Sequence, residues 1–165
     1  MPDILKLALL SLLPFLSLTV LAGCRGGQQQ EQQNSSPFLN FQKTPCLGIC
    51  PSYEAAIATD GIIRYVGWEH VPVKDTVYFQ LSDDEMQVLR QEVAQLNPST
   101  LSSTYLTEWS DMPSTITTFY QDGKEVKRVK QEEGGPQQLL TFQENLHQRI
   151  MRLVEAEAQR RLPVK

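Results

Sequence analysis

The sequence predicts an α+β domain, in which an antiparallel sheet of about five strands, with two hairpins, carries two helices packed on one face. Two observations support this fold class. First, Asp-Gly pairs at 60–61 and 122–123 each separate two strand-like segments, and Asp-Gly favours a two-residue hairpin turn. Second, two longer segments repeat apolar residues at helical spacing, one after each group of strands. Strands joined by tight turns are antiparallel, and no regular strand–helix–strand unit is visible, so the helices and the sheet are expected to form separate layers.

The first predicted hairpin pairs a strand at 53–59 with a strand at 62–71. A third strand is expected at 76–81, because Val77 and Phe79 alternate there with polar residues. These three segments form the first half of the predicted sheet.

A helix is predicted to begin after Ser82. The Ser82 hydroxyl can cap the helix, and Glu85 three residues later completes the pattern of a capping box. The pair Asn97-Pro98 ends the helix. Its apolar stripe consists of Met86, Leu89, Val93 and Leu96.

The second half of the domain repeats this order. A long polar connection at 98–113 leads to a hairpin with strands at 114–121 and 124–131. After the Gly-Gly-Pro turn at 134–136, a final helix is expected to run to about Arg161. Its apolar stripe consists of Leu139, Phe142, Leu146, Ile150 and Leu153.

Residues 1–23 have the pattern of a bacterial signal peptide. The apolar run 7–21 is shorter than the roughly 20 residues that a membrane-spanning helix needs. The run ends in Leu21-Ala22-Gly23-Cys24, which resembles the lipobox of bacterial lipoproteins. That resemblance implies cleavage before Cys24 and attachment of a diacylglyceryl group to its thiol.

The predicted location is therefore the cell envelope, where lipid on Cys24 holds the protein on a membrane. Arg25 rather than Asp follows the cysteine, which in a Gram-negative cell implies the outer membrane, facing the periplasm. Residues 26–37 are Gln-rich and lack large apolar side chains, which is typical of a flexible tether. We assign 24–42 to the lipidated cysteine and the tether, and 43–162 to a single folded domain.

The charge pattern argues against nucleic acid as a partner. The formal net charge is −4. The short basic segment 124–130 interleaves its Lys and Arg residues with Val and Glu, as a solvated strand does.

A ten-residue motif at 44–53, TPCLGICPSY, precedes the first Asp-Gly turn. The pattern T-P-C-x-G-x-C-P-x-Y, followed by an Asp-Gly hairpin, resembles the opening signature of an uncharacterised bacterial domain family. The resemblance covers roughly residues 43–154. The family is a domain of unknown function, usually found on exported or lipid-anchored proteins, so the resemblance implies domain boundaries and no activity.

Cys46 and Cys50 in this motif leave three interpretations open. An even pair in an oxidising compartment favours a disulfide, and Gly48 lets the intervening chain turn tightly. The run Cys-x-x-x-Cys-Pro is also found in thioredoxin-like copper chaperones, so copper held by both thiolates and a histidine, His70 or His147, is the second interpretation. A reactive redox pair is the third, although redox cysteines usually lie at a helix start.

No catalytic constellation is visible in the sequence. Ser102 and Ser103, for example, lack a neighbouring histidine with an orienting carboxylate. We therefore expect a non-enzymatic binding or structural module of the envelope, without a cofactor, whose ligand or partner protein is not specified by the sequence. The alternative is a copper-binding or thiol-redox protein that uses Cys46 and Cys50.

Overall fold

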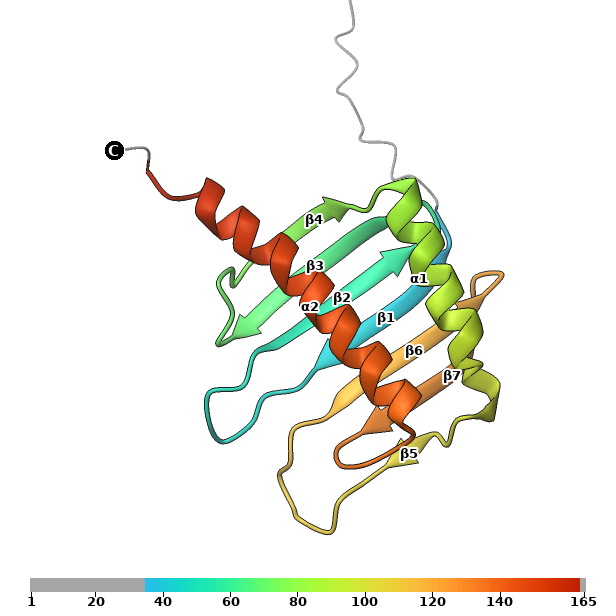
Figure 1. Cartoon of the computed structure of the whole chain (residues 1–165). Coiled ribbons are helices and arrows are strands. Elements are labelled where there is room, and N and C mark those ends of the chain that lie inside the picture. The colour runs from blue at the N-terminus through green and yellow to red at the C-terminus, as the bar shows by residue number, and fades with distance from the viewer. Residues whose placement is uncertain (1–34, 164–165) are drawn as a thin grey trace, which may run out of the picture. The chain divides into compact units, whose positions relative to one another are not determined.

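The computed structural model describes residues 35–163, which form one sheet and two helices (Figure 1). The strands are β1 (Pro37–Lys43), β2 (Ser52–Ala58), β3 (Ile62–Glu69), β4 (Thr76–Gln80), β5 (Thr104–Tyr105), β6 (Thr115–Gln121) and β7 (Lys124–Gln131). The helices are α1 (Asp83–Leu96) and α2 (Gln137–Arg160), and a short 3-10 turn, η1 (Pro98–Thr100), follows α1. The strand order is β4-β3-β2-β1-β6-β7-β5, and every neighbouring pair is antiparallel except β5 with β7.

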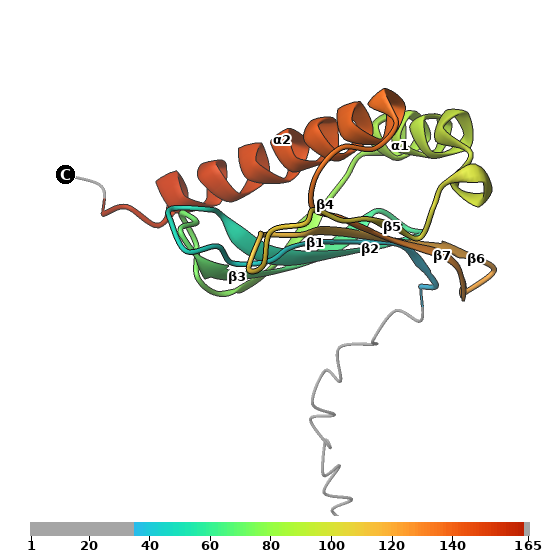
Figure 2. The same cartoon turned by 90° about the horizontal axis from the view of Figure 1, so that it is seen from below.

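Both helices pack on the same face of the sheet, and the described residues leave the other face uncovered (Figure 2). The predicted α+β class is confirmed. The predicted number of strands was too low, because the sheet has seven strands rather than about five.

The strand β1 corrects the predicted domain boundary. Residues 37–42 were predicted to belong to the tether, yet they lie in the central strand, which pairs with β2 on one side and β6 on the other. Leu39 and Phe41 are fully buried under the helices, while Asn40 and Gln42 alternate with them. By pairing on both edges, β1 joins the two predicted hairpins into one sheet.

The other strand that the prediction missed is β5, within the connection at 98–113. It has only two residues, and it pairs in parallel with the end of β7, Thr104 with Lys130 and Tyr105 with Gln131. A two-residue strand is too short to produce an alternating pattern, so the sequence contains no signal for it.

The helices follow the predicted patterns closely. Ser82 and Glu85 form the expected capping box at the start of α1. The stripe on α2 is buried as predicted up to Ile150, but its last fully buried residue is Val154, and Leu153 is only partly buried. These helix side chains and the inward side chains of the sheet make a single core.

Candidate functional site

The loop between β1 and β2 carries Cys46 and Cys50, which form a disulfide. Their Cα atoms lie 5.8 Å apart, and the backbone N–H of Gly48 donates to Sγ of Cys46 at 3.2 Å. The disulfide interpretation is confirmed, and both sulfurs are engaged in this state.

The disulfide loop is joined at its base to the loop that precedes β6. The N–H of Thr44 donates to the carbonyl of Ser114 at 2.9 Å, and the N–H of Ser114 donates to Oγ1 of Thr44 at 2.7 Å. The carboxylate of Glu132 in turn accepts from the Ser114 hydroxyl and from the N–H of Thr107, each at 3.3 Å. These bonds hold the bases of both loops together at one end of the sheet.

The last residue of the cysteine motif, Tyr53 near the start of β2, contacts a histidine of α2. The ring of Tyr53 is fully buried, and its hydroxyl lies 2.7 Å from Nδ1 of His147, with the two rings stacked. Burial raises the pKa of Tyr53 far above its usual value, so its hydroxyl keeps its proton. Burial, reinforced by the charge of Lys43, lowers the pKa of His147, so the imidazole is neutral at neutral pH.

The direction of this hydrogen bond follows from the surroundings of the hydroxyl. If Nδ1 of His147 carried a proton and donated it, the Tyr53 hydroxyl proton would have no acceptor in a buried position, which is unfavourable. Tyr53 therefore donates to Nδ1, and the imidazole carries its proton on Nε2.

Lys43, the last residue of β1, is a half-buried cation next to this pair. It lies opposite Tyr53 in the β1–β2 register and opposite Thr115 in the β1–β6 register. Burial lowers the pKa of Lys43, and the negative charge of Glu144 partly opposes that shift. Among residues 35–163, no carboxylate forms an ion pair with the Lys43 ammonium.

The Lys43 side chain lines a cleft of about 470 Å³ between the first half of α2 and the strands β1, β6 and β7. Most of the lining groups are polar. They include Lys43, Thr115, Gln131, Gln137, Thr141 and Glu144. The cleft thus presents one ammonium and one carboxylate among uncharged amide and hydroxyl groups, a combination suited to a polar, charged ligand.

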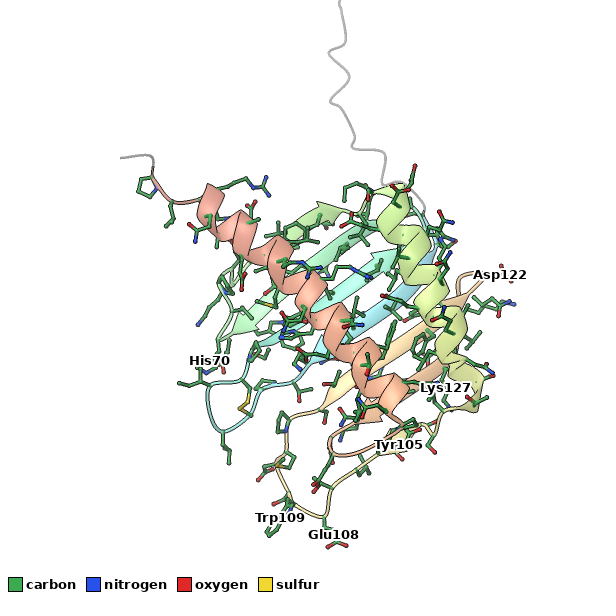
Figure 3. The ribbon with its side chains drawn as sticks, viewed as in Figure 1. His70, Tyr105, Glu108, Trp109, Asp122 and Lys127 are labelled. Atoms are coloured by element: carbon green, nitrogen blue, oxygen red, sulfur yellow. A yellow bond between two sulfur atoms is a disulfide. The ribbon has the colours of Figure 1, made fainter. Side chains whose placement is uncertain are left out.

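His70, the proposed third copper ligand, is exposed and follows directly on β3 (Figure 3). Its backbone has φ 54°, which ends the strand two residues before the predicted end at 71. Ser52, which directly follows the disulfide loop, pairs with Glu69 at the end of β3. The next residue, His70, therefore lies close to that loop. Within the part of the chain that the structure describes, no three His, Cys, Asp or Glu side chains converge as a metal site, so the copper alternative gains no support there.

A family model for a domain of unknown function, DUF6438, matches residues 37–150. The chain belongs to the DUF6438 family. The match begins at the first residue of β1 and ends inside α2, so the DUF6438 domain contains the whole sheet, the disulfide loop and the lining of the cleft. This confirms the resemblance that the cysteine motif predicted. No curated protein matches the chain.

The candidate site was only partly predictable from the sequence. The two cysteines were predicted to pair, and His147 was predicted only as a possible copper ligand, whereas in the structure it is hydrogen-bonded to Tyr53. Lys43 and Glu144 were not predicted, because the cleft that they share depends on the packing of α2 against β1.

The predicted signal peptide, Cys24, Arg25 and the tether up to residue 34 lie outside the described residues. Between residues 35 and 163, the structure contains no helix with the length and apolar character required to cross a bilayer.

Proposed function

We propose that this protein is a lipid-anchored binding module of the cell envelope, held by lipid on Cys24, and that its ligand occupies the cleft beside Lys43. The lipobox supports the location, and the polar cleft supports binding rather than a purely structural role. The ligand we propose carries both a carboxylate and an amine, as an amino acid or a dipeptide does.

The observation that carries this proposal is the half-buried Lys43 ammonium, which has no ion-pair partner among residues 35–163. Moving an ammonium out of water is unfavourable unless an opposite charge or hydrogen bonds compensate. A ligand carboxylate would supply that compensation, and charge-assisted hydrogen bonds are the stronger class in proteins.

The carboxylate of Glu144 further limits which ligands fit the cleft. Its carboxylate lines the same cleft, where it would repel a ligand that carries only negative charge. A protonated amine on the same ligand would instead be attracted to the Glu144 carboxylate. A zwitterionic ligand therefore matches both charged groups of the cleft.

The test is titration calorimetry on the full-length protein in detergent with alanyl-alanine, its N-acetyl derivative and its C-terminal amide. We expect the free dipeptide to bind best, the acetyl form to bind more weakly, and the amide to lose at least about tenfold in affinity. Lys43→Met should reduce dipeptide binding to the level of the amide. Glu144→Gln should weaken the free dipeptide but leave the acetyl form unchanged.

The matched control is Lys124→Met, which removes the same charge from the exposed start of β7. Equal dipeptide affinity for wild type and Lys43→Met, or no binding of any of the three compounds, would refute the proposed ligand site.

A further inference from the structure

Five large apolar side chains are exposed on the two joined loops, and we call them the apolar tip. They are Leu47 (95% exposed), Ile49 (87%), Leu106 (56%), Trp109 (76%) and Met112 (42%). We propose that the apolar tip is a docking surface for a partner protein that offers an apolar pocket bordered by basic side chains. This inference goes beyond the proposed ligand cleft, because it concerns a different surface and a macromolecular partner.

The two loops lie at the same end of the sheet because they connect to adjacent strands, β1 and β6, at that end. Lys43, where β1 ends, pairs with Thr115, where β6 begins. Both loops project from that end of the sheet, away from the start of β1 at Pro37 (Figure 1). The Thr44–Ser114 hydrogen bonds then fix the loops side by side at their bases.

The exposure of these residues calls for an explanation. A single exposed apolar side chain is ordinary, but several large ones on one surface are typical of an interaction site. Trp109, whose side chain projects from the loop before β6 (Figure 3), belongs to the residue type most enriched among binding hot spots.

The loops are also held in place before any partner binds. The disulfide closes the loop that presents Leu47 and Ile49, and Glu132 holds the loop of Trp109 through Thr107 and Ser114. A preordered loop loses less conformational entropy on binding, so a small apolar surface can give useful affinity.

The charged residues of the two loop segments indicate the kind of partner. The loop segments 44–51 and 106–114 contain no Lys, Arg or His, and their charged residues are Glu108 and Asp111, both exposed and on either side of Trp109. An anionic membrane surface would repel these carboxylates, and a second copy of this chain would present the same negative charges. A protein with Lys or Arg around an apolar pocket complements both features of the tip.

The test is site-specific photocrosslinking in cells that make the full-length protein. A photoreactive phenylalanine derivative would replace Leu47 or Trp109 at the tip, and Val126 or Leu162 as exposed controls elsewhere. We expect both tip positions to give the same protein adduct and the two control positions to give none. Mass spectrometry should place the crosslink on the partner near Lys or Arg residues.

Charge reversal then tests the basis of recognition. Glu108→Lys with Asp111→Lys should reduce the yield of the adduct about tenfold, whereas Glu125→Lys on β7 should leave it unchanged. An adduct that survives the charge reversal, appears equally from the controls, joins two copies of this chain or contains only lipid would overturn the proposal, as would the absence of any adduct. Lys43→Met should not alter the adduct, so failure of the tip and failure of the ligand cleft are distinguishable.

Discussion

Tyr53 and His147 lie 94 positions apart in the sequence, and a 2.7 Å hydrogen bond joins their side chains. This contact ties the cysteine motif at the start of β2 to the middle of α2. It also fixes the imidazole as the Nε2–H tautomer, next to the Lys43 ammonium.

Replacement of Tyr53 by Phe tests that hydrogen bond. The ring and its packing remain, but Nδ1 of His147 loses its donor, so we expect the free energy of unfolding to fall by about 1–2 kcal/mol. Urea denaturation measures the loss, and nitrogen NMR of the His147 ring reports its tautomer. A Tyr53→Phe protein with unchanged stability and an unchanged Nε2–H imidazole would show that the bond does not set the tautomer.

The lowered pKa of His147 predicts how stability depends on pH. Its folded pKa lies below the unfolded value of about 6.5, so the unfolded chain binds the proton more readily. The stabilisation is therefore fully present above about pH 6.5 and is lost as pH falls from there toward the folded pKa. We expect the melting temperature to decrease over that range, and His147→Gln to reduce the decrease. An equal pH dependence in wild type and His147→Gln would contradict this account.

Gly67 near the end of β3 predicts a severe packing defect. A Cβ at this position would collide with the carbonyl oxygen of Val73, which lies in the connection between β3 and β4. Because the obstacle is backbone, we expect Gly67→Ala to destabilise the protein by about 3 kcal/mol or more. At Gly48 the nearest atom is Cys46 Sγ at 3.8 Å, so Gly48→Ala should change stability by no more than about 0.5 kcal/mol. Thermal unfolding of both variants compares them directly, and similar melting temperatures would count against the described packing.

Lys43→Met is expected to weaken ligand binding without destabilising the fold. In the unliganded protein, it removes a half-buried ammonium that forms no ion pair within the described part of the chain, so the melting temperature should equal or exceed that of wild type. A marked decrease in melting temperature would mean that the ammonium stabilises the fold. The Lys43 ammonium would then no longer support a ligand site in the cleft. Lys124→Met again serves as the control for loss of one positive charge.

The sequence predicted those parts of the fold that depend on local chemistry. The Asp-Gly turn at 122–123, the Ser82–Glu85 capping box and the α2 stripe up to Ile150 all use signals within a few residues, and the structure contains each of them. At 60–61 the predicted two-residue turn is instead part of a three-residue connection, 59–61. The strand β1 was missed because it follows a Gln-rich segment and pairs only with strands that come later in the chain.

The candidate site was predictable only in part for the same reason. Cys46 and Cys50 lie four positions apart and carry their own signal, and the disulfide was expected. The cleft, by contrast, combines Lys43 with Glu144 from α2, and nothing in the spacing of these residues indicates that they share a cavity. Long-range packing brings them together, as it does Tyr53 and His147.

The proposed function depends on membrane attachment through Cys24, and the mass of the native protein's N-terminus tests this most directly. Intact-mass and fragment spectra of protein extracted from membranes should show a chain that begins at Cys24 with a diacylglyceryl group on its sulfur. A native chain that begins elsewhere, or that carries a free thiol at Cys24 and separates from membranes without detergent, would contradict the account.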